Sequence, residues 1–273
     1  SVLHDLVRFH VEEGTDALII CGSTGEAATM SIDEQRIATA VAVDAAARRI
    51  PIIVGCGGSD TKQVVRLGVQ AANAGADGIL LSAPPYNKPP QRGLIAHFRA
   101  VVEAADLPAV IYNVPGRSAV NILPETIAAL ADDDRFVGIK EASGDISQIA
   151  EVARLVGGRM TIWSGNDDQT IPVMALGGRG IISVLGNAAP SETSRMAHAW
   201  LDGDTETALK LQLRFLPLIR LLFTEPNPIP IKMAVAWLGF DVGDVRLPLV
   251  AASAEFRERL VSALNDSGVA RSS

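Results

Sequence analysis

Short runs of apolar residues alternate with amphipathic segments over most of this chain, and this alternation constrains the fold more than any other feature. Seven such runs, each followed by turn residues, lie at 17–23, 51–57, 78–84, 109–115, 137–143, 161–167 and 180–187. The segments between them, such as 33–49 and 61–75, have the apolar spacing of helices. Strands that are apolar on both faces and alternate with helices are typical of a parallel sheet covered by helices. The pattern therefore predicts an α/β fold.

A (β/α)₈ TIM barrel is the preferred architecture, because no run is followed by the G-x-G-x-x-G sequence of dinucleotide-binding open sheets. A closed barrel of this type has eight strands, and residues 3–13 read as a helix before the first run. We therefore expect that the first strand is absent from this chain. The barrel would span residues 1–189, and residues 190–273 would form a C-terminal helical region packed on it. Its helices are expected at about 191–202, 204–223, 230–237 and 253–266.

Composition and charge exclude several classes of protein. The chain has 273 residues, 48% of them hydrophobic, which suffices for one large core. A net charge of −7 without a long Lys/Arg run argues against nucleic-acid and anionic-membrane partners. No run approaches the roughly 18 consecutive apolar residues of a membrane span. Cys21 and Cys56 lie in apolar runs without metal-ligand spacing, so we expect reduced thiols in a cytoplasmic protein.

Candidate functional residues follow the strands, since the active site of such a barrel forms at the C-terminal strand ends. Lys140 ends an apolar strand, and Tyr86 and Tyr112, the only tyrosines, lie at the tips of two others. Other residues at these ends are Ser23, Thr24, Arg117, Ser164, Gly165, Asn166, Ser183 and Asn187. Taken singly, each has a structural interpretation: the lysine could reach solvent, the tyrosines could belong to the core, and Arg117 could cap a helix.

Taken together, these residues favour one chemistry. Burial lowers the pKa of a lysine amine, so Lys140 would supply a neutral nucleophile near neutral pH. Such an amine condenses with a ketone to give an imine, and the hydroxyls of Tyr112 and Ser23 could move the protons. The carboxylate of a 2-oxo acid could bind backbone N–H groups and the hydroxyl of Thr24. Arg117 could hold a second carboxylate bidentately.

Seven motifs lie in order along the chain: GSTGEA (22–27), PPYNKPP (84–90), YNVPGRS (112–118), GIKEASGD (138–145), SGND (164–167), GIISVLGN (180–187) and EPNPIPIK (225–232). Together they resemble the dihydrodipicolinate synthase and N-acetylneuraminate lyase superfamily. The resemblance implies a (β/α)₈ barrel with a C-terminal helical region, assembled as a homodimer or homotetramer. It implies small-molecule substrates, pyruvate and an aldehyde acceptor, and neither a metal nor a cofactor.

By position, the resemblance implies catalytic roles for four residues. Lys140 resembles the lysine that forms a Schiff base with pyruvate, and Tyr112 resembles the tyrosine that assists imine formation and proton transfer. Ser23 keeps the hydroxyl of the threonine usual in the family. Tyr86 resembles the tyrosine that is contributed across the tight-dimer interface to the partner's proton relay.

The resemblance also implies substrate-binding roles. Thr24 would help to hold the carboxylate of pyruvate, the backbone of Ile182 would lie near it, and Gly165 ends a strand at the same site. Arg117 stands where the synthases bind the carboxylate of aspartate semialdehyde, whereas sialic acid lyases usually lack this arginine. Pro85 departs from the synthase pattern, which favours a second tyrosine there.

These assignments predict a class I, lysine-dependent synthase that condenses pyruvate with L-aspartate 4-semialdehyde to give 4-hydroxy-tetrahydrodipicolinate, in lysine and diaminopimelate biosynthesis. One alternative is a pyruvate-dependent aldolase or dehydratase acting on a 2-oxo sugar acid, of the N-acetylneuraminate lyase or 2-keto-3-deoxy-sugar acid type. A second alternative is a non-catalytic barrel that only binds a 2-oxo acid.

The resemblance also bears on regulation. Lysine-sensitive synthases bind lysine in a cleft between the subunits of the tight dimer, beside the G-x-T-G-E loop. The corresponding positions here are Ala27, Ile32, Gln35, Ser59, Gln63 and Pro85. Gln63 lacks the carboxylate that would pair with the ammonium of lysine, and Pro85 lacks a tyrosine hydroxyl. The sequence therefore predicts an enzyme that is insensitive to lysine.

Overall fold

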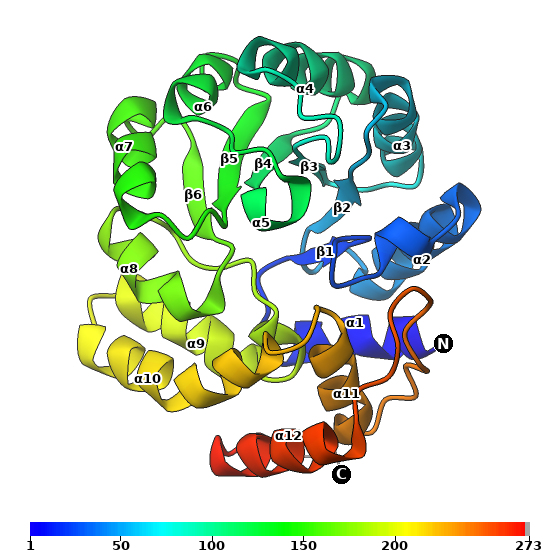
Figure 1. Cartoon of the computed structure of the whole chain (residues 1–273), viewed down its shortest axis with the longest axis vertical. Coiled ribbons are helices and arrows are strands. Elements are labelled where there is room, and N and C mark those ends of the chain that lie inside the picture. Colours follow the sequence, from blue (N-terminus) through cyan, green and yellow to red (C-terminus); the bar gives the residue numbers. More distant parts are fainter. Residues whose placement is uncertain (271–273) are drawn as a thin grey trace.

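Six parallel strands form one curved sheet in the computed structural model, which describes residues 1–270 (Figure 1). They follow the order of the sequence, and each pairs in parallel with the next. The strands are β1 (Leu18–Ile20), β2 (Ile52–Cys56), β3 (Gly78–Ser82), β4 (Ala109–Asn113), β5 (Phe136–Glu141) and β6 (Thr161–Ser164). Each lies within or next to one of the first six predicted runs. The parallel α/β sheet is therefore confirmed, although residues 1–270 show six strands instead of the eight of a closed barrel.

The seventh predicted strand, at 180–187, is wrong as an extended strand. Only Ile181 forms a parallel bridge, with Ser164, and the chain then turns into the short 3₁₀ helix η3 (Leu185–Asn187). The carboxylate of Asp167 accepts hydrogen bonds from the backbone N–H groups of Val184 (3.0 Å) and Leu185 (3.4 Å). These N–H groups turn toward a buried side chain, so the segment does not continue along the edge of the sheet.

Helices cover the outer face of the curved sheet (Figure 1). They are α1 (Val2–Glu12), α2 (Ile32–Ala46), α3 (Thr61–Asn73), α4 (Gln91–Ala105), α6 (Pro124–Leu130), α7 (Ile146–Val156) and α8 (Thr170–Ala175). The short helix α5 (Pro115–Ser118) lies instead within the curve of the sheet, and the chain also forms the 3₁₀ turns η1 (Ala27–Thr29) and η2 (Asp167–Gln169). Side-chain caps set where several of the helices begin: Asp145 accepts a hydrogen bond from the N–H of Gln148 and caps α7, which begins five residues after Glu141. The loop that follows Lys140 is thereby short and anchored.

Four further helices follow the sheet: α9 (Pro190–Leu201), α10 (Thr205–Leu222), α11 (Ile229–Leu238) and α12 (Ala254–Asp266). They match the predicted helices within a few residues. Their apolar faces form a second core, which includes Ile171, Val184 and Leu185 from the segments after β6. Through this shared core, the C-terminal helices pack against the segments that follow β6. None of the helices in residues 1–270 is long and apolar enough to cross a membrane.

Candidate active site

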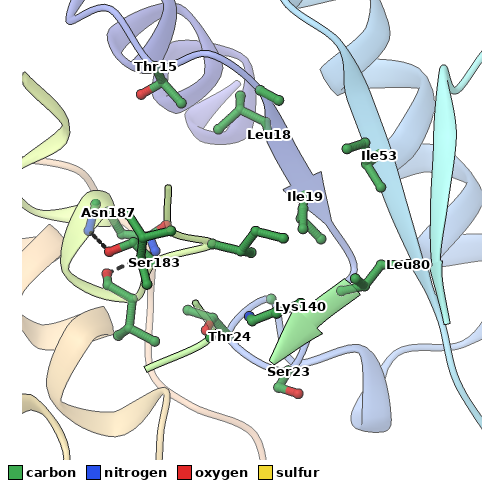
Figure 2. A pocket seen from close by; sticks show the side chains of 18 of the residues that line it. Thr15, Leu18, Ile19, Ser23, Thr24, Ile53, Leu80, Lys140, Ser183 and Asn187 are labelled. Atoms are coloured by element: carbon green, nitrogen blue, oxygen red, sulfur yellow. Dashed lines mark hydrogen bonds between the residues drawn. The ribbon is translucent and has the colours of Figure 1, made fainter. Parts of the chain in front are cut away.

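A cavity of about 820 Å³ lies on the inner side of the sheet. Each strand from β1 to β6 contributes at least one residue to its wall: Ile19, Ile53, Leu80, Tyr112, Lys140 and Trp163 are examples in chain order. Seven of the eight predicted site residues line it: Ser23, Thr24, Tyr112, Arg117, Lys140, Gly165 and Ile182. Figure 2 shows Lys140 beside Thr24 and Ser23, with Ser183 and Asn187 from the segment after β6 on the other side.

Lys140 lies in the strand β5 with its side chain in this cavity. Its pKa falls from 10.5 to about 8, because burial removes the hydration of the ammonium; the carboxylate of Asp167 opposes this shift and the guanidinium of Arg117 adds to it. The amine Nζ lies 4.4 Å from the centre of the Tyr112 ring. Lys140 therefore has a substantial neutral fraction near pH 8, as a nucleophilic amine requires.

Gly165 makes room for the stem of Lys140. A Cβ atom added at Gly165 would lie 3.0 Å from Lys140 Cε, 3.1 Å from Lys140 Cγ and 2.7 Å from the Cβ of Ala142. The backbone N–H of Gly165 also donates to the carbonyl of Glu141 at 2.7 Å. The tip of β6 thus packs directly on the lysine and limits where its amine can point.

Tyr112 faces the same space from the neighbouring strand β4, where it pairs in register with Lys140. Its side chain is buried, which raises the pKa of the phenol, while the guanidinium of Arg117 acts in the opposite direction. The phenol therefore stays protonated at neutral pH. No partner in residues 1–270 hydrogen-bonds to this hydroxyl, so it is free to donate to a bound molecule.

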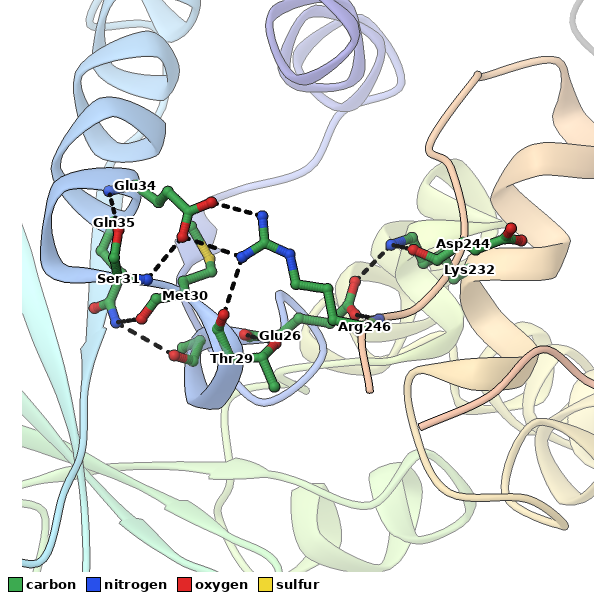
Figure 3. Close-up of polar contacts among 10 residues, drawn as sticks. Glu26, Thr29, Met30, Ser31, Glu34, Gln35, Lys232, Asp244 and Arg246 are labelled. Carbon is green, nitrogen blue, oxygen red and sulfur yellow. Dashed lines mark hydrogen bonds and ion pairs between the residues drawn. The ribbon is translucent and has the colours of Figure 1, made fainter. Parts of the chain in front are cut away.

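The loop after β1 carries Ser23 and Thr24, and it is tied to the C-terminal helices. Glu26, which has a left-handed backbone (φ 56°), accepts hydrogen bonds from Lys232 Nζ (2.6 Å) and from the backbone N–H of Arg246 (3.0 Å), as Figure 3 shows. This network lies beside the cavity, since Glu26 and Lys232 both line it. The loop is therefore braced from residues more than 200 positions away.

Arg117 enters the cavity from the short helix α5, directly after β4. Its Nη2 donates to the backbone carbonyl of Asn227 at 3.3 Å, and the side chain of Asn227 donates to Thr24 Oγ1 at 2.8 Å. Arg117 forms no ion pair within residues 1–270. A guanidinium that faces a cavity without a carboxylate partner is suited to bind an anionic group.

Tyr86 is the one predicted site residue that this chain does not bring to the cavity. Its side chain is 91% exposed and its backbone is left-handed (φ 71°). Two hydrogen bonds brace its loop: Ser59 Oγ donates to the Pro85 carbonyl at 2.9 Å, and Asn87 Nδ2 donates to the Ser59 carbonyl at 3.0 Å. The loop therefore presents an exposed aromatic side chain on an anchored backbone.

Sequence reasoning missed three buried polar residues: Asn227 lines the cavity, and Glu141 and Asp167 are hydrogen-bonded to residues that line it. Glu141, 1% exposed, accepts hydrogen bonds from the side chains of Asn113 (2.8 Å) and Gln148 (3.0 Å) and thereby joins β4, β5 and α7. Asp167 and Asn227 anchor the segments that carry Ser183 and Thr24. All three lie inside the quoted motifs, but the motifs alone did not show which of their polar residues are buried.

The cysteines are buried and free, as the sequence analysis expects, and burial raises the pKa of Cys21 to about 11 and of Cys56 to about 12. Their thiols are therefore poorly reactive at neutral pH. No group of histidine, cysteine, aspartate and glutamate side chains in residues 1–270 is arranged to hold a metal ion.

Comparisons with known proteins identify relatives along the whole chain. The model of the Dihydrodipicolinate synthetase family matches residues 1–267. The chain is 49% identical to the 4-hydroxy-tetrahydrodipicolinate synthase of Thermoanaerobacter sp. (strain X514), over 98% of this chain and 90% of that protein.

Two solved structures are similar to this fold. The chloride-inhibited dihydrodipicolinate synthase of Acinetobacter baumannii, complexed with pyruvate, has a TM-score of 0.95 and 39% identity over 98% of this chain and 92% of that chain. The corresponding enzyme (DHDPS) of Cyanidioschyzon merolae, with lysine bound, has a TM-score of 0.95 and 37% identity over 98% and 92% of the two chains.

Proposed function

Since this chain belongs to the dihydrodipicolinate synthetase family, we propose that it condenses pyruvate with L-aspartate 4-semialdehyde to form 4-hydroxy-tetrahydrodipicolinate, in lysine biosynthesis. The reaction is that of a Schiff-base-forming lyase. The observation that carries this proposal is the amine of Lys140, whose pKa is lowered to about 8 inside a cavity beside the Tyr112 ring. The pyruvate complex of the A. baumannii relative agrees with a 2-oxo acid as the first substrate.

The first half of the reaction uses the neutral amine of Lys140. Its lone pair attacks the carbonyl carbon of pyruvate, and the oxygen leaves as water after it takes up protons, which leaves a cationic C=N bond. Tyr112 and Ser23 lie in the same cavity and would pass these protons. The carboxylate of pyruvate would bind beside the hydroxyl of Thr24, the backbone of Ile182 and Gly165.

The second half forms the carbon–carbon bond. Loss of a proton from the methyl carbon of the cationic imine gives an enamine, and this carbon attacks the aldehyde of the acceptor. Arg117 would bind the carboxylate of the acceptor, because it faces the cavity and has no carboxylate partner in residues 1–270. The cationic side chain of Arg117 favours aspartate semialdehyde, which carries a carboxylate. It gives no such advantage to the uncharged aldehydes that are the acceptors for most 2-oxo sugar acids.

The experiment that tests this function compares substrates directly. Pyruvate is incubated with L-aspartate 4-semialdehyde, and a 2-oxo-3-deoxy sugar acid and N-acetylneuraminate are incubated separately, with product identification by mass spectrometry. We expect product only from the first pair. Pyruvate release from either sugar acid at a higher kcat/KM would instead favour the aldolase alternative, and no turnover of any substrate would favour the non-catalytic one.

We also propose that the six-stranded sheet is part of a (β/α)₈ barrel. The parallel bridge between Ser164 and Ile181 would mark the place of the next strand. The C-terminal helical region after residue 189 would pack on this barrel, and the enzyme would act in the cytoplasm. It would assemble as a homodimer or homotetramer in which the exposed side chain of Tyr86 reaches the proton relay of the neighbouring subunit.

Subunit complementation tests this role of Tyr86. Tyr86→Phe should be impaired because the partner's site loses a hydroxyl, and Lys140→Met should be inactive. When the two variants are refolded or expressed together, a mixed dimer contains one site with both Lys140 and the hydroxyl of Tyr86. We expect activity above the sum of the separate variants in a steady-state assay. If mixing restores nothing although mixed dimers form, Tyr86 does not act across an interface.

We predict that lysine inhibits this enzyme weakly. Ile32 is 41% exposed where a polar group would be needed, and the side-chain amide of Gln35 is already used by the carbonyl groups of Ala27 (3.3 Å) and Met30 (3.4 Å). Loss of two charge-assisted contacts, each contributing about 1.5–3 kcal/mol, weakens binding by roughly a hundredfold or more. Calorimetric titration should detect no lysine binding below about 1 mM.

The C. merolae relative, which was solved with lysine bound, is the positive control for this titration. Half-inhibition of the present enzyme below about 1 mM lysine would show that the cleft positions have been assigned wrongly.

A further inference from the structure

Two buried polar side chains lie directly after the candidate catalytic pair, on the other face of the sheet. Tyr112 on β4 is in register with Lys140 on β5, and the next pair in register is Asn113 and Glu141. Since successive side chains of a strand point to opposite faces, Asn113 and Glu141 face the helices while Tyr112 and Lys140 line the cavity. Asn113 is 0% exposed and Glu141 is 1% exposed. A pair of buried polar groups therefore backs the pair of reacting groups.

A hydrogen bond joins the two buried side chains directly. Asn113 Nδ2 donates to Glu141 Oε1 at 2.8 Å. The neighbours fix the direction of this bond, because the backbone N–H of Ile122 donates to Asn113 Oδ1 at 3.0 Å and leaves the NH₂ group for Glu141. Glu141 also accepts from the side chain of Gln148 (3.0 Å) and from the backbone N–H of Ser143 (2.9 Å). The amide on β4 is therefore the donor, and the carboxyl group on β5 is the acceptor.

This contact lies where the two strands end, at Asn113 and Glu141. The backbone continues the connection: the N–H of Ala142 donates to the carbonyl of Asn113 at 2.9 Å, and the N–H of Gly165 donates to the carbonyl of Glu141 at 2.7 Å. Gly165 in turn packs on the stem of Lys140. A movement of Glu141 would therefore also move the residues that confine the amine of Lys140.

Imine formation depends on the relative position of the two reacting side chains. The amine of Lys140 must reach the carbonyl carbon of pyruvate while the hydroxyl of Tyr112 reaches the oxygen of the same molecule. The two groups come from different strands, and the amine lies 4.4 Å from the centre of the Tyr112 ring. A misplacement on the order of 1 Å can lower a rate on the order of a hundredfold. A contact that fixes the end of β5 against the end of β4 therefore contributes to the rate.

We propose that Asn113 and Glu141 are positioning residues, whose hydrogen bond on the outer face of the sheet holds the amine of Lys140 and the phenol of Tyr112 in place for imine formation. The inference rests on the proposed function, since it assumes that pyruvate forms the imine on Lys140. Neither residue contacts a substrate in this account. Other groups hold the carboxylate of pyruvate, so loss of this bond should slow imine formation more than it weakens pyruvate binding.

Exchange of the donor and the acceptor tests the proposal. Asn113→Asp places one carboxylate opposite another, and Glu141→Gln leaves an NH₂ group facing another donor, either Asn113 or Ser143. In the double variant, the amide at position 141 donates to the carboxylate at position 113, and the N–H groups of Ile122 and Ser143 keep their acceptors. The double variant therefore restores a hydrogen bond of the opposite direction between the same two strands.

Each protein is treated with pyruvate and borohydride at several pyruvate concentrations, and the rate of adduct formation on Lys140 is measured. The comparison is made above about pH 9, where the amine of Lys140 is mostly neutral and a changed charge has little effect on its protonation. For each single variant we expect a maximal rate about tenfold below that of wild type, with a half-saturating pyruvate concentration that changes less than about threefold. The maximal rate of the double variant should return to within about threefold of wild type. Glu125→Gln, the same substitution at an exposed position of α6, should leave both quantities unchanged.

A folded Glu141→Gln variant with the wild-type maximal rate would overturn the proposal, and so would a double variant that is no faster than the single variants. A change confined to the half-saturating concentration would overturn it as well, because it would show an effect on pyruvate binding alone. If wild type forms no adduct on Lys140, the proposed function fails. If wild type forms the adduct and the single variants match its rate, this inference alone fails.

Asn113→Ala replaces Asn113→Asp if the latter does not fold, because alanine removes the donor without adding a charge. Glu141→Gln should then slow imine formation in the wild-type background but much less in the Asn113→Ala background, where the bond is already absent. Circular dichroism checks that each variant is folded. Equal slowing in both backgrounds would show that the two residues act independently, which would overturn the proposal.

Discussion

Pyruvate and borohydride should attach a reduced three-carbon group to Lys140 and to no other lysine of this chain. The chain has five lysines, at 62, 88, 140, 210 and 232. Lys232 also lines the cavity, but its ammonium is ion-paired with Glu26 at 2.6 Å, so its lone pair is not free to attack. Lys140 combines a position in the cavity with a pKa lowered to about 8. Peptide mass mapping after reduction locates the adduct.

The matching variant is Lys140→Met, which keeps an unbranched side chain of similar length and removes the amine. Loss of a covalent nucleophile should reduce kcat on the order of 10⁴-fold or more, since the other groups act only through the imine. In wild type, the imine-forming rate should rise as pH increases through about 8, because the neutral form of the amine reacts. An adduct on another lysine, or an active Lys140→Met variant, would eliminate this mechanism.

Replacement of Arg117 by alanine should impair use of the acceptor far more than formation of the pyruvate imine. The guanidinium faces the cavity and, among residues 1–270, donates only to the backbone carbonyl of Asn227. When the acceptor carboxylate loses its bidentate partner in a desolvated site, the free energy of the transition state should rise by a few kcal/mol. This corresponds to a decrease of roughly a hundredfold or more in kcat/KM for the acceptor. Steady-state kinetics with aspartate semialdehyde varied at saturating pyruvate give this number.

Arg117→Lys is the informative companion, because it keeps the charge and loses the planar pair of donors. It should recover only part of the activity. The borohydride reaction should be compared above about pH 9, because Arg117 also lowers the pKa of Lys140 and its removal shifts the amine toward the protonated form. If both half-reactions decline equally at that pH, Arg117 has a structural role.

Much of the candidate site could be predicted because its signals are local. An apolar run reports a buried strand whatever lies around it, and the residue at its end faces the same edge as the ends of its parallel neighbours. Lys140, Tyr112 and Ser23 could therefore be assigned to one site from their positions at the ends of strands, and the structure brings all three to one cavity. Their individual roles remain proposals that the experiments above test.

Tyr86 shows where this local reasoning ends. It follows β3, whereas Tyr112 lies at the end of β4, and a left-handed turn carries Tyr86 out to solvent, where it is 91% exposed. Position after a strand does not determine which way a loop leaves the sheet.

The sequence by itself determined the alternation of strands and helices, the C-terminal helices and the position of a lysine at the tip of a buried strand. Only the tertiary structure decided that the run 180–187 bends into η3, and that Asp167, Glu141 and Asn227 are buried. The reason is that hydrophobic periodicity reports the burial of each segment separately. The hydrogen bonds of these polar residues can instead join distant segments: Asn227 donates to Thr24, 203 positions away. Whether a carboxylate faces water or backbone N–H groups, as that of Asp167 does, depends on how those distant segments pack.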